Sequence, residues 1–506
     1  MKTYEIILKG ASISMFGLFL SKLISYATII IVSKIGSENF GLLNLSFSVI
    51  SFLAMIFLLG LNSGVLRYVS YYLGKNDKER IKGTVLAALK ICGIIGVVIL
   101  ILLVIFSNYI AIEIFKKPEL ASIIRILALM MPLIILTEIF VSTFLSYKKI
   151  EYTTLIRDIS EKIVKLILIA IFLSLGFGLI GITLSYVISA LFTSLLLFYF
   201  LRKDIFPVFD KRIKAKYNTK ELLLYSLPLI MTGLLTMLQK WADTFILGIY
   251  RTASEVGVYN IAFSSAALLV MVPTALMSLF TPVITNLYGR NKIKEIRKIS
   301  IVVTKWIFMG NMPLFIFLVI SPKSLLKFVF STEYASGYSA LTILAVAYVL
   351  LSITHVYVSN LLMVKKTKLI SFLVLMSTLV NIILNILLIP KYGINGAALA
   401  TLVSSLVFST SIAISAWFAI RLQTLNFSFI KIILAGILSS LIMVYIHKVL
   451  PSNLFFLIVS AFLSLIIYIL ILFLLKCLSK EDIEVIKYLK KKIVARLNLK
   501  IWRDDD

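Results

Sequence analysis

The chain carries one pattern twice: SENFGLLNLSFS at residues 37–48 returns as SEVGVYNIAFS at residues 254–264. Gly41 and Gly257 are 216 positions apart, and so are Asn44 and Asn260. A fixed spacing of this kind indicates an internal repeat of about that length.

Other short matches keep nearly the same spacing, 215 to 217 residues, and follow the same order along the chain. They are Gly74-Lys75-Asn76 with Gly289-Arg290-Asn291, Lys148-Lys149 with Lys365-Lys366, and Gly178 and Gly181 with Gly393 and Gly396. Each match is weak by itself, but their constant spacing predicts two halves that share one fold.

The composition around the repeat is that of a membrane protein. Of 506 residues, 60% are hydrophobic and 15% are charged, and the mean hydropathy is +1.05. Soluble domains carry about 25% charged residues and could not bury so much apolar surface. Cys92 and Cys477 both lie in apolar runs, which excludes a disulfide scaffold and a cysteine-rich metal site.

Fourteen apolar stretches are long enough to cross a bilayer, which takes about 20 residues of helix. Their approximate centres are Lys22, Leu53, Ile95, Pro132, Val164, Ala190, Thr236, Val272, Met309, Leu350, Leu379, Val407, Leu438 and Leu465. Backbone groups in lipid must be hydrogen-bonded within the protein, so these stretches are predicted to be helices. The expected fold is therefore an all-α polytopic membrane protein with fourteen transmembrane helices.

The repeat divides these spans into six, six and two. Because six is even, both halves enter the membrane in the same direction and are related by an axis along its normal. Two such bundles enclose a cleft that rocking opens to alternate sides. The predicted parts are a first bundle (1–201), a basic linker (202–220), a second bundle (221–421), helices 13 and 14 (422–478) and a basic tail (479–506).

Positive charge sets the predicted orientation. With the N-terminus inside, the inner loops and termini hold 35 Lys and Arg residues and the outer loops hold 8. This bias predicts a protein of the cytoplasmic membrane with both termini cytoplasmic. It also accounts for most of the net charge of +28, so the charge does not indicate nucleic-acid binding. A cleavable signal peptide is the weaker interpretation of the N-terminus, since the apolar run is too long.

Two basic segments have open interpretations. The linker, RKDIFPVFDKRIKAKYNTK from Arg202, either lies along the inner membrane surface or is a plain charged loop. The tail, where Ile486, Leu489, Ile493 and Leu497 recur at helical spacing, is either a surface helix on anionic lipid or a partner-docking helix.

Two lysines are predicted near the membrane midplane. Lys22 precedes Lys34 by twelve residues and Lys240 precedes Arg251 by eleven, so each lies about 17 Å from the outer end of its helix. They occupy nearly equivalent positions in the two repeats. Facing a central cleft, they would suit an anionic phosphate; the alternatives are buried ion pairs or snorkelling. Lys305, within about 10 Å of a helix end, is close enough to snorkel.

Other intramembrane charges are expected to pair. Asp243 shares a helix face with Lys240 and either pairs with it or carries a coupling proton. On the fifth helix, spacings of three and four join Arg157 with Glu161, Asp158 with Lys162 and Glu161 with Lys165, and Glu138 on the fourth helix is expected at the depth of Lys162. These groups either neutralise one another or line a path for sugar.

Two further polar positions are expected to act near these charges. Arg67, at the start of an inner loop, either contacts phosphate or anchors the topology. Asn381 and Asn385, four residues apart on one helix face, are expected to bond between helices.

The chain resembles a known family in its six-six-two arrangement, in the stretch at 37–48, in Gly60-Leu61 ahead of Arg67-Tyr68, and in LPLIMTGLLTMLQKWADTFILG from Leu227. These features are similar to those of the polysaccharide flippases of the multidrug/oligosaccharidyl-lipid/polysaccharide exporter superfamily. The resemblance implies translocation of an oligosaccharide carried on a polyprenyl phosphate or pyrophosphate. The multidrug branch usually has twelve helices and a carboxylate in its first helix, where this chain has Lys22, so proton- or sodium-coupled drug export is the second hypothesis.

Enzymatic chemistry has little support in the sequence. The chain has no G-x-x-x-x-G-K-[ST] motif and no metal-ligand spacing, so neither a nucleotide nor another cofactor is expected. A polytopic glycosyltransferase or polymerase would need a large outer loop with catalytic groups, and the longest one, 321–338, holds only Glu333 as a carboxylate. The expected partners are the lipid-linked substrate, membrane lipids and enzymes of the same pathway.

Overall fold

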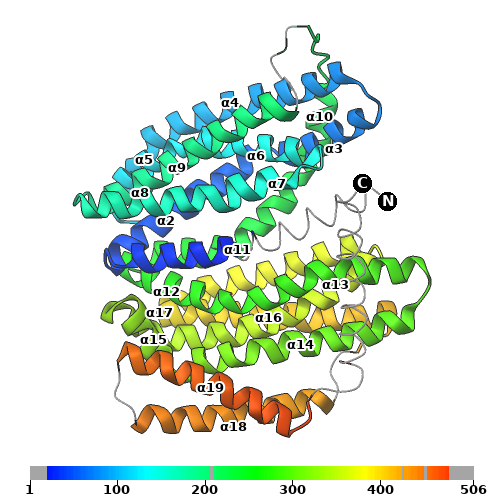
Figure 1. Ribbon diagram of the computed structural model, residues 1–506. Helices are drawn as coiled ribbons and strands as arrows, with labels where there is room; N and C mark the ends of the chain where they lie inside the picture. The colour runs from blue at the N-terminus through cyan, green and yellow to red at the C-terminus, as the bar shows by residue number, and fades with distance from the viewer. Residues whose placement is uncertain are drawn as a thin grey trace, which may run out of the picture. The chain divides into compact units, whose positions relative to one another are not determined.

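The computed structural model describes residues 17, 20–205, 210, 212–423, 427–449, 453–477 and 482. In this part of the chain every regular element is a helix, as Figure 1 shows, which confirms the predicted all-α membrane fold. Most of the predicted tail, and positions 206–209 and 211 of the linker, lie outside the described residues.

Helices follow one another through short turns. They are Leu20–Ser33, α2 (Ser37–Phe57), α3 (Leu61–Gly74), α4 (Lys78–Tyr109), α5 (Leu120–Ala128), α6 (Met130–Ser146), α7 (Ile150–Thr153), α8 (Glu161–Ser174), α9 (Gly178–Phe200), α10 (Thr219–Ser226), α11 (Ile230–Tyr250), α12 (Ala253–Ala266), α13 (Met271–Gly289), α14 (Ile293–Ile320), α15 (Pro322–Leu325), α16 (Tyr338–Met363), α17 (Thr367–Ile420), α18 (Phe427–Val449) and α19 (Leu454–Leu474).

Nine of the described helices are long and apolar enough to cross a membrane, or eleven if two bent pairs each count as one span. The 54 residues of α17 would extend about 80 Å, far more than a bilayer core. Its backbone breaks at Gly393 (φ 56°, ψ −133°), and Asn381 and Thr401, on either side, lie within 3.5 Å of each other. The two arms of α17 therefore run antiparallel, while the total of fourteen spans stays a prediction.

The chain forms two compact units. Unit 1 comprises residues 1–264, 329–340 and 378–401, and unit 2 comprises residues 265–328, 341–377 and 402–506. Unit 1 thus contains the first six predicted spans together with α11 and α12 of the second repeat. The domain boundaries expected from the sequence stay a prediction.

Equivalent positions of the two repeats adopt the same unusual backbone conformation. Asn76 and Asn291 have φ values of 55° and 57°, and Lys148 and Lys365 have 59° and 61°. A left-handed conformation is uncommon for residues other than glycine. Its recurrence at matched turns supports the repeat found in the sequence.

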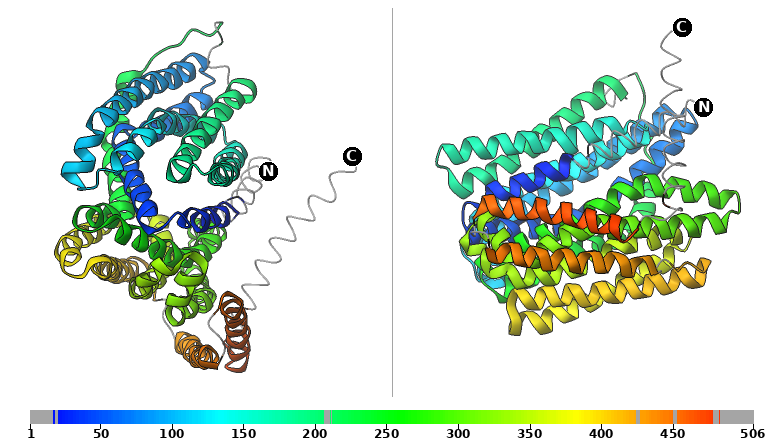
Figure 2. Two further views of the ribbon diagram at one scale, coloured as in Figure 1. Left: turned by 90° about the vertical axis from the view of Figure 1, so that its left-hand side faces the viewer. Right: turned by 60° about the horizontal axis from the view of Figure 1, so that its bottom comes forward.

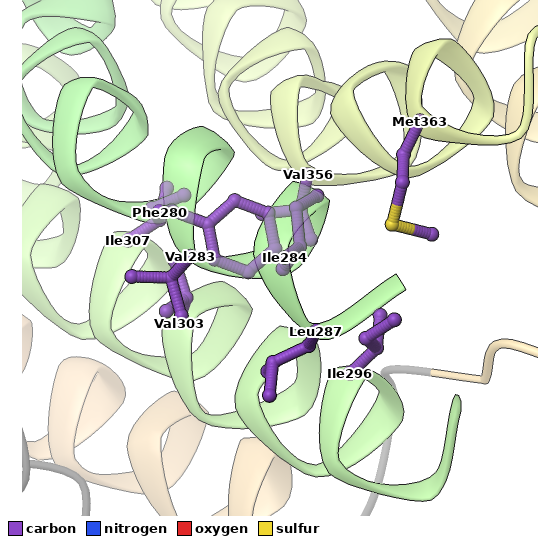
Figure 3. Close-up of a cluster of buried hydrophobic side chains, with 9 residues drawn as sticks. All are labelled: Phe280, Val283, Ile284, Leu287, Ile296, Val303, Ile307, Val356 and Met363. Carbon is purple, nitrogen blue, oxygen red and sulfur yellow. The ribbon is translucent and has the colours of Figure 1, made fainter. Parts of the chain in front are cut away.

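The core of unit 2 packs α13, α14 and α16 together. Its buried side chains, shown in Figure 3, are Phe280, Val283, Ile284, Leu287, Ile296, Val303, Ile307, Val356 and Met363. The pair α18 and α19, orange and red in Figure 2, lie side by side and pack on α14.

One hydrogen bond explains where α19 meets α14. Pro313 has no N–H, so it leaves the carbonyl of Met309 without its helical donor. Tyr468 of α19 is buried and donates its hydroxyl to that carbonyl at 3.0 Å. The proline in one helix thereby provides an attachment point for another.

Lys305 does not snorkel, contrary to the expectation from its depth. Its side chain is 3% exposed and forms an ion pair with Asp482, which also accepts a hydrogen bond from the Trp306 indole at 3.0 Å. The reason is a carboxylate distant in sequence, which replaces water as the partner of the ammonium group.

Part of the linker is held against the first bundle. Lys82 of α4 donates to the carbonyls of Asp210 and Ile213, and the amide of Lys216 donates to Glu79 at 3.0 Å. A Cβ on Gly83 would lie 2.0 Å from the Lys216 carbonyl oxygen, so the close approach requires glycine there. Asp210, Ile213 and Lys216 of the linker are therefore held against α4.

Candidate functional site

Three lysines from three helices of unit 1 form what we call the lysine cluster: Lys22, Lys162 and Lys240. Lys22 lies on Leu20–Ser33, Lys162 in the first turn of α8, and Lys240 on α11. The charge of Lys22 acts on both other ammonium groups. Lys22 and Lys240 are exposed, so protein atoms leave space around them. Lys22 lies near each of the other two ammonium groups, and cations gathered on membrane helices in this way are suited to bind an anion.

The fifth predicted span is not a continuous α-helix, and this changes its ion pairs. Residues Thr154–Ser160 form a π-helix between α7 and α8. In that segment hydrogen bonds join residues i and i+5, so residues four apart no longer lie directly above one another. Arg157 accordingly pairs with Glu138 of α6 at 2.5 Å, rather than with Glu161 as expected.

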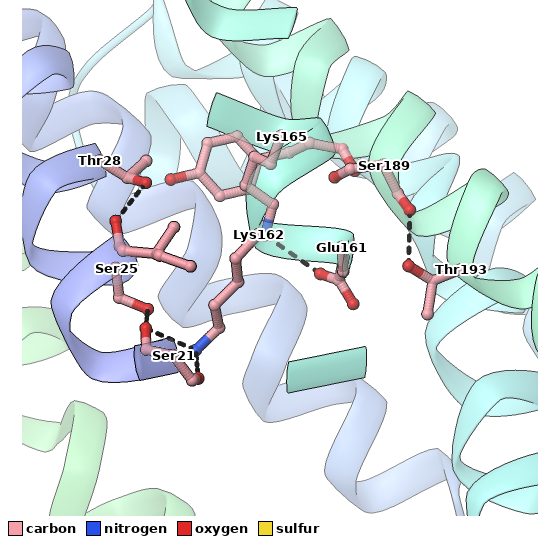
Figure 4. Close-up of polar contacts among 10 residues, drawn as sticks. Ser21, Ser25, Thr28, Glu161, Lys162, Lys165, Ser189 and Thr193 are labelled. Atoms are coloured by element: carbon pink, nitrogen blue, oxygen red, sulfur yellow. Dashed lines mark hydrogen bonds and ion pairs between the residues drawn. The ribbon is translucent and has the colours of Figure 1, made fainter. Parts of the chain in front are cut away.

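The α-helical part of the same span keeps the expected spacing. Glu161 and Lys165 form an ion pair at 3.1 Å, visible in Figure 4. The Lys165 ammonium also lies over the ring of Tyr186, 4.6 Å from its centroid. Among the carboxylates near the lysine cluster, Glu138 and Glu161 are therefore each engaged by another cation.

Lys162 was expected to pair with Asp158, but its hydrogen bonds go to another helix. Its ammonium donates to the hydroxyl of Ser21 at 2.5 Å and lies 3.4 Å from the Ser21 carbonyl oxygen (Figure 4). Ser21 directly precedes Lys22. Asp158 acts on Lys162 through its charge.

Asp243 bonds to neutral groups rather than to Lys240. Its buried carboxylate accepts hydrogen bonds from Tyr259 (2.5 Å), Thr401 (2.6 Å), Asn385 (2.6 Å) and Asn381 (3.1 Å). Lys240, three residues earlier, instead lies over the Trp241 ring at 5.1 Å. The expected bonding of Asn381 and Asn385 between helices thus occurs, with Asp243 as the acceptor.

The Asp243 site has the chemistry of a proton or small-cation site. Its carboxylate oxygens are surrounded by amide and hydroxyl groups, and the Oδ1 atom of Asn385 is buried without a hydrogen-bond partner. The amides present N–H groups to the carboxylate, so the oxygen ligands that hard cations prefer are here the carboxylate, the hydroxyls and the Oδ1 atom of Asn385. Within the described residues no group of three His, Cys, Asp or Glu side chains could hold a metal ion.

Arg67 lies on α3 and contacts aromatic rings. Its guanidinium group lies 4.1 Å from the centroid of Tyr225 and 5.6 Å from that of Tyr68. The group is exposed. Cation–π contacts hold it at the end of the bundle that is predicted to be cytoplasmic.

The two copies of the repeated pattern touch each other at the predicted outer side. The hydroxyls of Ser37 and Ser254 lie 2.7 Å apart. A Cβ on Gly41 would come 1.7 Å from the Ala253 carbonyl oxygen, and one on Gly257 would come 2.0 Å from that of Ser37. Both glycines are required because α2 and α12 approach to backbone contact here. We call this the Ser37–Ser254 contact.

Loop residues add hydrogen bonds at the same end of unit 1. The carboxylate of Glu333 accepts from the amide of Ser37 at 2.7 Å, and Lys34 donates to the carbonyls of Val329 and Phe330. These side chains satisfy helix ends that lack partners in their own helix. The sequence analysis missed this arrangement, although the matched glycines of the repeat were its signal.

Comparisons with known proteins agree with this architecture. The family profile described as polysaccharide biosynthesis protein matches residues 7–288, and the MatE profile matches residues 228–387. The uncharacterized membrane protein MJ1068 of Methanocaldococcus jannaschii is 25% identical over 500 residues, which cover 94% of this chain and 97% of that protein. The probable low-salt glycan biosynthesis flippase Agl15 of Haloferax volcanii is 26% identical over 230 residues, 44% of this chain and 48% of that protein.

Solved structures share the fold. The lipid II flippase MurJ in an inward closed conformation superimposes with a TM-score of 0.73 at 19% identity, over 90% of this chain and 97% of that one. An inward-facing multidrug resistance MATE transporter superimposes with a TM-score of 0.70 at 18% identity. The match covers 81% of this chain and 98% of the transporter. With a family profile matching more than half of its length, the chain belongs to the polysaccharide biosynthesis protein family, in the flippase branch of the multidrug/oligosaccharidyl-lipid/polysaccharide exporter superfamily.

Proposed function

We propose that this protein is a flippase that moves a lipid-linked oligosaccharide across the cytoplasmic membrane by alternating access. The lysine cluster carries the proposal. It brings three cations together at membrane depth, while Glu138 and Glu161 pair with other residues. The phosphate or pyrophosphate of a polyprenyl carrier supplies the missing negative charge. The name of one relative, the probable low-salt glycan biosynthesis flippase Agl15, supports a glycan as cargo, and the name of another, the probable flippase AglR, supports flipping.

Each predicted site residue has a role in this proposal. Lys22 and Lys240 bind the headgroup phosphate. The Arg157–Glu138 pair has side chains that are 40% and 23% exposed, and it offers hydrogen-bonding groups to the sugar. Arg67 meets the headgroup at the cytoplasmic end, and Asp158 balances part of the charge of the cluster.

The Ser37–Ser254 contact closes the outer side in this cycle. It joins the two repeats through one hydroxyl pair and through the close approach of α2 and α12 at two glycines. The hydroxyl pair itself contributes about 1 kcal/mol, so breaking it adds little to the cost of separating the two helices. Its opening releases the glycan to the outer side.

Asp243 couples transport to an ion gradient in this proposal. Hydrogen bonds tie its carboxylate to α12 and to both arms of α17, so proton or sodium binding alters contacts among three helices. The protein itself catalyses no bond chemistry. Glycosyltransferases on the inner side supply the substrate, and a polymerase or transferase on the outer side consumes it, with both termini cytoplasmic.

Coupled drug export is the second candidate, favoured by the MatE match to residues 228–387. An efflux assay distinguishes the two, because an exporter expels cationic dyes when a proton or sodium gradient is imposed on vesicles. We expect no gradient-driven dye efflux, since the lysine cluster repels cations. Efflux that stops in Asp243→Asn would favour the drug exporter.

Removing the two midplane lysines tests the headgroup site. In vesicles containing a fluorescent polyprenyl-linked glycan, we expect Lys22→Ala and Lys240→Ala each to slow flipping about tenfold, and the double variant more. Each change removes a charged contact that contributes about 1.5–3 kcal/mol. Lys294→Ala, an exposed lysine on α14, is the matched control. Wild-type flipping in the double variant would remove the phosphate role of these lysines.

Cross-linking the Ser37–Ser254 contact tests alternating access. We expect Ser37→Cys with Ser254→Cys, in a background with Cys92→Ala and Cys477→Ala, to form a disulfide under oxidation, because the replaced hydroxyls lie 2.7 Å apart. Oxidation then stops flipping and a reductant restores it. Each single cysteine variant serves as a control and keeps its flipping rate. Full activity of the cross-linked protein would contradict an outer closure at this contact.

Neutralising Asp243 tests the coupling site. If wild-type flipping accelerates in an imposed proton or sodium gradient, Asp243→Asn should flip at one rate with or without it, because the amide carries no titratable charge. Comparing the two gradients identifies the ion. Glu221→Gln, on an exposed residue of α10, is the control. A gradient response retained in Asp243→Asn would exclude this carboxylate as the coupling group.

A further inference from the structure

Lys162 lies near the positive charge of Lys22, and its hydrogen bonds go to a serine rather than to a carboxylate. Its ammonium group donates to Ser21, which is 2% exposed, and Ser21 is adjacent to Lys22 (Figure 4). The contact places a second positive charge beside the turn that presents Lys22. An unpaired cation in such a position is costly unless an anion completes the site.

The surrounding carboxylates leave an excess of positive charge. Glu138 is paired with Arg157, Glu161 with Lys165, and Asp243 accepts from four neutral groups. Asp158 and Glu161 both act on Lys162 through their charges, but Glu161 is balanced by Lys165, so among these carboxylates Asp158 is left to offset the three lysines. Three lysines and one aspartate give a formal charge of two positive units.

The second repeat does not reproduce this charge. A spacing of 215 to 217 residues relates Lys162 to Ser377, Thr378 and Leu379, none of which is charged. The third cation therefore belongs to the first bundle alone. Lys22 and Lys240 form a nearly symmetric pair, and Lys162 makes the positive charge greater on the side of the first bundle.

We propose that Lys162 determines the headgroup specificity of the site by favouring a diphosphate over a monophosphate linkage. The proposal rests on the flippase function proposed above and deepens it. A phosphodiester carries one negative charge and a diphosphate diester carries two. The two charges of the diphosphate equal the excess positive charge of the site. The additional phosphate lies toward α8, where the ammonium of Lys162 meets it.

The test compares two ligands that differ by one phosphate. A short polyprenyl chain is linked to N-acetylglucosamine through one phosphate or through two, and dissociation constants are measured by thermophoresis with the full-length protein in nanodiscs. We expect the wild type to prefer the diphosphate by about tenfold or more, the size of one charged contact. Lys162→Gln should abolish the preference by weakening diphosphate binding, while monophosphate binding changes little.

Two variants separate charge from folding and positioning. Lys162→Arg keeps the charge and should retain the preference. Ser21→Ala removes the hydroxyl partner but leaves the ammonium group, and it should also retain the preference. If Ser21→Ala loses the preference as fully as Lys162→Gln does, Lys162 only positions the helix and the proposal is overturned. Lys294→Gln controls for a general loss of positive charge.

The remaining outcomes distinguish this proposal from the flippase function. If Lys22→Gln and Lys240→Gln weaken both ligands while Lys162→Gln leaves their ratio unchanged, the specificity role is overturned and the headgroup site stands. If neither ligand binds the wild type, or if Lys22→Gln and Lys240→Gln bind like the wild type, the headgroup site is overturned and the specificity role with it.

Discussion

A charge inside a bilayer needs a partner, and this requirement organises the polar interior of unit 1. Lipid offers neither water nor counter-ions, so each ionised side chain must meet an opposite charge, a set of hydrogen-bond donors or acceptors, or a ligand. Arg157 meets Glu138, Lys165 meets Glu161, and Asp243 meets four neutral donors. After these contacts are made, Asp158 offsets part of the positive charge of Lys22, Lys162 and Lys240, and the flippase function proposed above assigns the rest to a substrate headgroup.

The sequence was sufficient to predict the helical fold, because both the apolar composition and the repeat are distributed along the whole chain. The matched turns at Asn76 and Asn291, and at Lys148 and Lys365, adopt the same left-handed backbone. The conformation of a turn is set by a few neighbouring residues, so a short sequence motif is enough to predict where the turn lies. The count of spans is harder to obtain, since α17 merges two arms and bent pairs such as α5 and α6 interrupt single spans.

The individual pairings in the site could be predicted only in part. Glu161 and Lys165 lie in regular α-helix, so their spacing identified the pair. Arg157 lies in a π-helix, where the α-helical spacing does not apply, and its partner is on another helix. The partners of Asp243 are more remote still: Asn381, Asn385 and Thr401 follow it by 138 to 158 residues. Nothing in the local pattern connects such distant positions, although a buried carboxylate and a pair of asparagines were each recognisable as polar groups in need of partners.

The two repeats share a backbone plan but differ in charge where their first and fifth helices meet. In the first repeat that contact joins Ser21 to a cation, Lys162. In the second, about one turn further along, it joins a carboxylate, Asp243, to Asn381 and Asn385. A site that attracts a phosphate cannot also attract a proton or sodium ion at the same point, because each charge would weaken the binding of the other. In the flippase function proposed above, the second repeat therefore holds the Asp243 carboxylate apart from the lysine cluster, among neutral hydrogen-bond donors, so that ion coupling and headgroup binding do not compete for one point.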